Sequence, residues 1–281
     1  MASENIIIVG CGFLGKAAAQ LFLAQGKQVL GIVRSAVPSM PSDSSFQIAS
    51  CDVTDIASVR ALAPKVPPST LMVYTVSSGK GGSEAYAAIY RDGLQCTIEA
   101  WQPERTIFVS STSVYAQTDG TIVTEESPTQ PTRETGRLLL EAEAIALASG
   151  GLVARFSGIY GPGRSVLLQK FLAGTATLEE GGKRWINQIH RDDGARALWH
   201  LGTTPHASGI YNVTDDTPAT QHDVYAWMAD YYHQLVPPNG PADLNRKRGW
   251  TSKRVSNEKL RVLGWTPQFP SYKEALPQLA V

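Results

Sequence analysis

The segment that decides the fold lies near the N-terminus and reads Ile6-Ile7-Ile8-Val9-Gly10-Cys11-Gly12-Phe13-Leu14-Gly15. Its first four residues are apolar and β-branched, which is typical of a strand buried on both faces of a parallel sheet. The glycines fit the pattern GxGxxG, which is informative only between a strand and a helix. Residues 16–25 are rich in Ala and Leu and are followed by Gly26, so the context is strand, turn and helix.

Each part of this turn has a physical task in binding a dinucleotide. Gly10 permits the tight turn, Gly12 lets the backbone approach a pyrophosphate, and Gly15 lets the helix pack closely on the strand. The N-terminus of the helix that follows offers N–H groups to the phosphates, and Phe13 and Leu14 of the motif are also expected to bind the cofactor. The alternative, an ordinary glycine-rich turn, is disfavoured by the flanking strand and helix.

The alternation of β-like and α-like runs continues to about residue 156. Further strands are predicted at 29–33, 46–49, 71–76, 106–110 and 152–156, and helices at 16–25, 55–63, 83–101 and 132–149, the last with Thr132 as N-cap. Such alternation predicts an α/β fold, a Rossmann doubly wound parallel sheet, as a dinucleotide-binding domain over residues 1–157.

The rhythm breaks after about Gly158, where Pro and Gly become frequent and a strand at 209–212 looks isolated. We therefore expect residues 158–281 to form a smaller, mixed substrate region, with some segments returning to the Rossmann sheet. In open α/β sheets the ligand lies in the crevice at the carboxyl edge of the strands, which this region would cover.

Composition narrows the classes of partner. The chain of 281 residues has 25 Lys plus Arg and 25 Asp plus Glu, so it lacks a general attraction to nucleic acid or anionic lipid. Three distant cysteines form no disulfide framework, which favours a reducing, cytoplasmic location. We see no export signal, no run of 18 apolar residues and no metal-ligand spacing among the five histidines, so neither a membrane span nor a metal is expected.

The end of the second strand indicates which dinucleotide is preferred. NAD sites usually have an acidic residue there, whereas this chain has Arg34 and Ser35. A guanidinium can bind a 2′-phosphate with two hydrogen bonds, so NADP is predicted over NAD, a solvated arginine being the alternative. After the third strand, Asp52 and Val53 lie where they would reach the adenine, although helix capping by Thr54 or Asp55 competes for this segment.

Several spaced motifs together resemble the extended short-chain dehydrogenase/reductases, which include the NAD-dependent epimerase/dehydratases. They are Val109–Tyr115 (similar to SSxxVYG, with Ala116 for the glycine), Arg155 with Tyr160–Gly163, His190–Asp193 and Tyr211–Val213. Within the family the chain is most similar to the YeeZ-like bacterial group, through Ser110–Tyr115, Gly120-Thr121, Pro128 with Pro131, Gly136-Arg137 and Gly161–Arg164.

This resemblance implies hydride transfer at a carbinol, with Ser111 binding the reacting oxygen. The family also uses a Tyr-x-x-x-Lys pair on one helix face, where the ammonium helps to lower a phenol pKa that is ordinarily near 10. Here the two positions carry Arg133 and Arg137. A guanidinium stays protonated and cannot replace the phenol as a proton carrier, although both arginines can hold an anionic group. The alternative is that both are solvated and paired with Glu134 or Glu141.

Four further residues are candidates for the site. Tyr115 is the nearest phenol in sequence to Ser111 and is a candidate substitute acid, although the family's tyrosine there normally packs. Arg155 and Arg164 are expected to line the substrate crevice. His190 is a candidate for contact with the substrate, because an imidazole titrates near neutrality, and a structural role is its alternative.

Two hypotheses about function follow. The first is an NADP-dependent oxidoreductase or epimerase-like enzyme with a modified catalytic pair, acting on a polar, anionic small molecule that includes nucleotide sugars as candidates. The second is a catalytically silent NADP-binding protein that senses cofactor state and acts through a protein partner. Under either, apolar residues on more than one face of helices 83–101 and 132–149 suggest a homodimer through these helices, as is frequent in the family.

Overall fold

The apolar run at residues 6–9 lies in a strand inside a seven-stranded parallel sheet. The protein is described by a computed structural model that covers residues 4–35, 45–79, 81–244 and 249–279. The strands follow the order β12-β7-β5-β4-β1-β2-β3, and every pairing between neighbours is parallel. They are β1 (Asn5–Val9), β2 (Gln28–Val33), β3 (Phe46–Ser50), β4 (Thr70–Tyr74), β5 (Arg105–Ser111), β7 (Leu152–Phe156) and β12 (Gly209–Val213).

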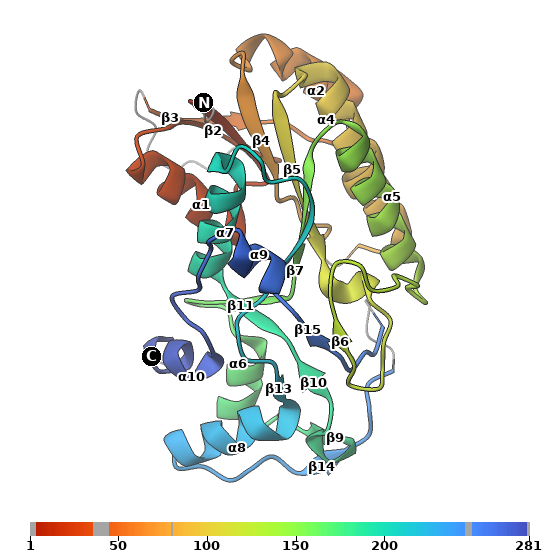
Figure 1. The fold of residues 1–281 in the computed structure, drawn as a ribbon, viewed down its shortest axis with the longest axis vertical. Coiled ribbons are helices and arrows are strands. Elements are labelled where there is room, and N and C mark those ends of the chain that lie inside the picture. Colours follow the sequence, from red (N-terminus) through yellow and green to blue (C-terminus); the bar gives the residue numbers. More distant parts are fainter. Residues whose placement is uncertain (1–3, 36–44, 80, 245–248, 280–281) are drawn as a thin grey trace.

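Helices cover both faces of this sheet (Figure 1). One face is covered by α1 (Phe13–Ala24) and α7 (Arg191–Thr203), which pack against each other. The other face is covered by α2 (Ile56–Leu62), α3 (Ser83–Tyr86), the π-helical turn η2 (Ala87–Asp92), α4 (Gly93–Trp101) and α5 (Glu134–Ala148). The Rossmann doubly wound fold is confirmed, and the double coverage explains why the central strands are largely apolar.

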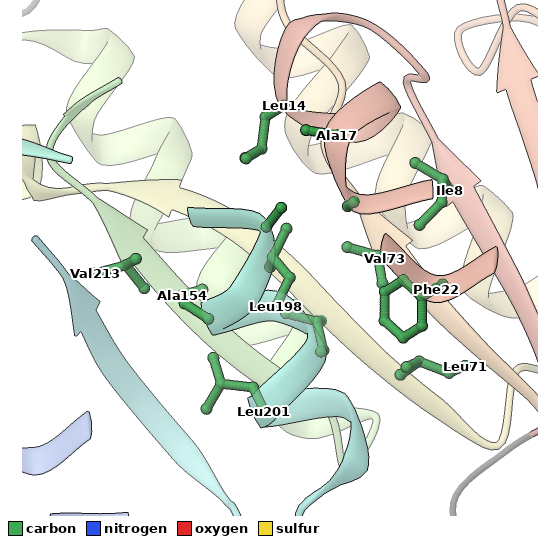
Figure 2. Packing of buried hydrophobic residues seen from close by; sticks show 14 of the residues in the cluster. Ile8, Leu14, Ala17, Phe22, Leu71, Val73, Ala154, Leu198, Leu201 and Val213 are labelled. Carbon is green, nitrogen blue, oxygen red and sulfur yellow. The ribbon is translucent and has the colours of Figure 1, made fainter. Parts of the chain in front are cut away.

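The side chains of each strand alternate between two apolar layers. Figure 2 shows the layer under α1 and α7, where Phe22 and Leu198 lie with Leu71 and Val73 of β4. Their neighbours Met72 and Tyr74 enter the opposite layer, with α4 and α5. Period-two alternation in a strand buried on both sides produces this arrangement.

Two helices differ in detail from the sequence prediction. The helix expected at 83–101 is continuous in the chain but includes the π-helical turn η2 between α3 and α4. The helix expected at 132–149 begins at Glu134, so Arg133 rather than Thr132 is the N-cap residue. A Cβ on Gly136 would lie 2.3 Å from the Cβ of Pro131, so the chain turns tightly here and the helix begins after that turn.

The C-terminal half contributes both to the sheet and to a separate apolar cluster. The strand near 209–212 is β12, which pairs with β7 and extends the main sheet. The helices α6 (Val166–Leu172), α8 (Gln221–Tyr231) and α10 (Tyr272–Ala275) pack around a third cluster, which lies below the sheet in Figure 1. The helix α9 (Glu258–Val262) instead packs against β12.

Short strand pairs lie outside the main sheet, and one of these pairs joins residues 122–123 to the C-terminal half. Three are parallel and one is antiparallel. They are β6 (Ile122–Val123) with β15 (Arg254–Val255), β8 (Gly158–Tyr160) with β11 (Gln188–His190), β9 (Leu178–Glu179) with β14 (Asn239–Gly240), and the antiparallel β10 (Trp185–Ile186) with β13 (Ala219–Thr220).

Across the described part of the chain, no helix combines the length and the apolar character that crossing a bilayer requires.

Candidate functional site

Two glycines of the loop between β1 and α1 are required by the protein's own packing. Gly10 has φ +89°, and a Cβ there would lie 2.7 Å from the backbone of Val76. A Cβ on Gly15 would lie 2.3 Å from the carbonyl oxygen of Gly10. The loop is also fixed to β2, because the N–H groups of Gly10 and Cys11 both donate to the carbonyl of Ile32.

The third glycine of the loop, Gly12, is not required by packing against the described residues. Its φ is −93°, and a Cβ there would lie 4.0 Å from the Gly10 oxygen, its nearest contact among the described residues other than its chain neighbours. Beside it α1 begins at Phe13 with no side-chain cap and no acidic first-turn residue among the described residues. The start of α1 therefore offers N–H groups and the positive end of a helix dipole to open space, an environment that fits a phosphate group.

The carboxyl ends of β2 and β3 bring together the residues predicted to select the dinucleotide. Arg34 and Ser35 are exposed at the end of β2. Asp52 accepts hydrogen bonds from the N–H and hydroxyl of Thr54, and these bonds, together with the nearby Arg34 charge, lower the pKa of the Asp52 carboxyl. Val53 is buried, and Asp55 is the N-cap of α2, so the competing capping role falls to Asp55.

Ser111 lies at the carboxyl end of β5, close to the start of the short helix η3 (Thr112–Val114). Its Oγ accepts a hydrogen bond from the N–H of Ser113 at 3.2 Å, which fixes the side chain at this edge of the sheet. Ser111 is 7% exposed, so a hydrogen bond to a ligand there would be shielded from water.

Arg133 and Arg137, which are predicted to occupy the positions of the family's Tyr and Lys, lie at the start of α5. The Arg137 side chain is 59% exposed and forms an ion pair with Glu134 at 2.8 Å. Arg133 is exposed and donates to the carbonyl of Leu244 at 2.8 Å. This arrangement matches the solvated alternative for Arg137, while the role of either arginine toward a ligand stays a prediction.

A buried polar network lies behind Ser111. The Arg155 guanidinium of β7 forms an ion pair with Glu143 of α5 at 2.6 Å, and both side chains are at most 4% exposed. Glu143 also accepts a hydrogen bond from the hydroxyl of Ser110 at 2.5 Å. The Tyr115 hydroxyl accepts a hydrogen bond from Arg155 and donates one to Asn212 of β12, each at 2.9 Å.

This network corrects the predicted placement of two residues. The Arg155 guanidinium is enclosed by Glu143 and Tyr115, so it does not line a substrate crevice. Tyr115 is fully buried, and burial raises the pKa of its hydroxyl. The Tyr115 phenol therefore packs in the interior, and its hydroxyl is bonded to Arg155 and Asn212 instead of facing a substrate as an acid.

His190 and Arg164 differ in their access to a ligand, because the His190 side chain is buried and the Arg164 side chain is exposed. The His190 Nδ1 accepts from the N–H of Asp192, which makes His190 the N-cap of α7, and its ring packs 4.2 Å from that of Phe269. Burial lowers the pKa of His190, so its neutral form is favoured and the structural alternative accounts for its contacts. Arg164 is exposed, with its guanidinium 5.1 Å from the Phe13 ring, beside the glycine loop.

Sequence reasoning missed several buried charged residues, among them Glu143, Arg184 and Lys253. Glu143 shares a helix face with Leu139 and Ala146, a spacing that already indicates an inward position. Arg184 and Lys253 are also largely buried, but their sequence neighbours carry no periodic signal. Among the described residues, no group of three or more His, Cys, Asp or Glu side chains is arranged to hold a metal ion.

Comparison with known proteins identifies the class. The chain matches the model of the NAD dependent epimerase/dehydratase family over residues 6–214, and it belongs to that family. It is similar to protein YeeZ of Escherichia coli strain K12, with 28% identity over 283 residues that cover 95% of this chain and 97% of YeeZ. The predictions of the family and of the resemblance to the YeeZ-like group are thereby confirmed.

Solved structures show the same fold. A structure from Methylobacillus flagellatus, assigned to the NAD-dependent epimerases/dehydratases, is 32% identical and has a TM-score of 0.80, covering 99% of this chain and 98% of that one. DesIV of Streptomyces venezuelae, a dTDP-glucose 4,6-dehydratase solved with NAD and TYD, has a TM-score of 0.82 at 18% identity, covering 98% and 95% of the two chains. At that identity the likeness to DesIV concerns the fold alone.

The buried ion pair allows a test of its structural role. Glu143→Gln leaves the Arg155 charge buried without its carboxylate, so we expect the free energy of unfolding to fall by about 3–5 kcal/mol. Glu134→Gln breaks the exposed pair with Arg137 and should cost under about 1 kcal/mol. Urea unfolding of both variants measures the contrast, and equal losses would contradict the assignment. A Glu143→Leu/Arg155→Met double variant should recover most of the loss, because it removes both charges.

Proposed function

We propose that this chain is a cytoplasmic enzyme that binds NADP in preference to NAD and acts as an oxidoreductase or epimerase on a polar, anionic small molecule. Nucleotide sugars are the first candidates, because the protein MoeE5, which has a similar fold, is solved with UDP-glucose and NAD. The three cysteines are all free thiols, which is consistent with a reducing compartment.

The observation that carries the proposal is the open space at Gly12. Packing explains Gly10 and Gly15, whereas a Cβ at position 12 would meet no atom closer than 4.0 Å among the described residues other than its chain neighbours. A glycine is useful there when a ligand approaches the backbone closely. The residues that would hold the pyrophosphate are Gly12 and the first turn of α1, which begins at Phe13 and Leu14.

The preference for NADP rests on the charge at the end of β2. Arg34 is exposed at the point where NAD-binding relatives of this fold usually place a carboxylate. The ionised Asp52 nearby attracts the Arg34 guanidinium and favours its position at this edge. A planar guanidinium there can form paired hydrogen bonds with a 2′-phosphate, and Ser35 can add its hydroxyl.

The chain's own residues have distinct tasks in this proposal. The dinucleotide, when bound, supplies hydride chemistry. Ser111 donates a hydrogen bond to the reacting oxygen of the substrate, while Arg133, Arg137 and Arg164 attract its anionic group. None of these arginines exchanges a proton near neutral pH, so proton transfer needs a group other than the residues in the family's Tyr and Lys positions.

A second candidate function is a catalytically silent NADP-binding protein that senses cofactor state and acts through a partner. It is favoured by the Arg137–Glu134 ion pair and by the enclosure of the Tyr115 hydroxyl, which leave no described phenol at the family's catalytic position. The two functions are separated by assaying NADPH-dependent turnover on a panel of carbonyl compounds and nucleotide sugars. Turnover by the unchanged chain supports the enzyme. Tight NADPH binding without turnover supports the silent protein, in particular if the Arg133→Tyr/Arg137→Lys variant gains turnover.

Gly12→Ala tests dinucleotide binding directly. Calorimetric titration with NADPH should show an affinity at least about tenfold below that of the unchanged chain, because the added methyl group occupies the pyrophosphate position. The free energy of unfolding should change by less than about 1 kcal/mol, since the Cβ meets no close protein atom. Gly10→Ala is the matched control and should destabilise the fold through its contact with Val76. Unchanged NADPH affinity in Gly12→Ala would refute the proposed cradle.

Arg34→Ala tests the choice between the two dinucleotides. Loss of charge-assisted hydrogen bonds to the 2′-phosphate should weaken NADP and NADPH binding by about 10- to 100-fold. Binding of NAD and NADH should stay within about twofold, because they carry no phosphate for this guanidinium. Equal changes for all four dinucleotides, measured by calorimetry, would assign Arg34 a structural role instead.

We also propose that the protein is a homodimer through residues 83–101 and 132–149. The helices α4 and α5 lie side by side on the outer face of the sheet (Figure 1), with Arg91 and Glu141 joined at 3.2 Å. Ala144, Leu147 and Ala148 are exposed on α5 and can pack against a second copy. Sedimentation at micromolar concentration should give about twice the chain mass of 30.3 kDa, and a monomer mass would refute this arrangement.

A further inference from the structure

An open hollow of about 400 Å³ lies away from the glycine loop, between the segment after Tyr115 and the C-terminal half. Its wall comes from three separate parts of the chain, which are residues 118–120, 180–185 and 250–252. Two indole rings, those of Trp185 and Trp250, contribute to the wall. Its size is within the range of pockets that bind small molecules.

The indoles are held in fixed positions. Trp250 donates its Nε1 hydrogen to Glu179 at 3.2 Å, and the Arg254 guanidinium lies 5.0 Å from the centre of the Trp185 ring. Trp185 is also fixed through its backbone, whose N–H donates to the hydroxyl of Ser252. Flat, immobilised rings favour a ligand that carries a ring of its own.

The largely buried Arg184 lines this hollow, and a second buried cation, Lys253, directly follows the lining residue Ser252. The Arg184 side chain is 15% exposed, and its Nε has no hydrogen-bond acceptor among the described residues. Arg184 nevertheless forms an ion pair with Glu179, whose carboxylate lies 3.5 Å from the Arg184 Nε. Lys253 is 4% exposed, and its Nζ donates to two neutral oxygens, the carbonyl of Tyr115 and the hydroxyl of Thr251, each at 2.9 Å.

This arrangement carries an excess of buried positive charge. Glu179 is paired with Arg184, whereas the hydrogen bonds of Lys253 to the described residues go to neutral oxygens, and the two cations repel each other. Burial, with the repulsion of Arg184, lowers the pKa of Lys253 to about 7. Burial also lowers the pKa of Arg184. An anion in the hollow would relieve both effects.

We propose that this hollow binds the anionic group of a ring-bearing small molecule, with Arg184 and Lys253 as the recognition pair and the two indoles against the ring. The hollow adjoins the Ser111 motif, because Lys253 bonds the backbone of Tyr115 four residues further on. The inference rests on the proposed function where it takes the bound molecule to be the enzyme's substrate, which would then carry both a ring and an anionic group. Anion binding itself needs no dinucleotide.

Binding should depend on pH through Lys253. The charged and titratable groups that surround it and Arg184 are Asp119, Glu179, Glu180, Lys183, Tyr225 and Arg254. Protonated Lys253 attracts the anion, and its charge is lost as the pH rises through about 7. An anion whose own charge is constant should therefore bind more tightly at pH 6 than at pH 8.5, by about tenfold or more.

The test is calorimetry of the full chain, without dinucleotide, using benzenesulfonate as a ring-bearing anion of constant charge. We expect it to bind more tightly than inorganic sulfate or neutral benzyl alcohol. Arg184→Gln should lower its affinity by at least about tenfold. Lys253→Met should abolish the pH dependence. Lys170→Gln, which removes an exposed charge on α6, is the matched control and should change nothing.

Several outcomes would overturn the inference. They are no benzenesulfonate binding, binding that is equal at both pH values, or binding that Arg184→Gln leaves intact. If Lys253→Met fails to fold, Arg184→Gln and the pH comparison on the unchanged chain decide the matter. Because NADPH is absent, failure here leaves dinucleotide binding standing, and failure of NADPH binding leaves this site standing.

Discussion

The ion pair between Glu143 and Arg155 is the interaction around which the predicted catalytic edge is organised. It joins α5 to β7, and through Ser110 and Tyr115 it reaches both ends of the Ser111 segment. Asn212 extends the connection to β12, and Lys253 holds the backbone of Tyr115 from the C-terminal half. Because every member is buried and hydrogen-bonded, the Ser111 segment is held by low-dielectric contacts that resist displacement.

The edge of the sheet has an unusual balance of proton carriers and fixed charges. Family members with the Tyr-Lys pair carry a phenol that can gain and lose a proton, whereas this chain is predicted to have Arg133 and Arg137 there, and a guanidinium has no acceptor for a proton. The phenol nearest in sequence, Tyr115, is enclosed by Arg155 and Asn212. Fixed positive charge orients an anionic ligand well, but any proton it exchanges must come from another group.

Local signals predicted most of the fold, and long-range contacts account for what they missed. The β1 strand and the Gly10–Gly15 turn were predictable because an apolar run and a glycine pattern act over a few residues. The enclosure of Arg155 was not, since it depends on a tyrosine 40 positions earlier in the chain. Lys253 meets the Tyr115 carbonyl across 138 residues, a pairing that neither periodicity nor spacing encodes.

The pairing of β12 with β7 also has a consequence for biosynthesis. The strand β7 ends at Phe156, but its outer neighbour ends at Val213, and α7 must be made before the face beside α1 is covered. A nascent chain therefore carries an unpaired strand edge and an uncovered apolar face for more than fifty residues of synthesis. Exposed edges of this kind invite pairing with other chains, so the growing polypeptide depends on shielding during that interval.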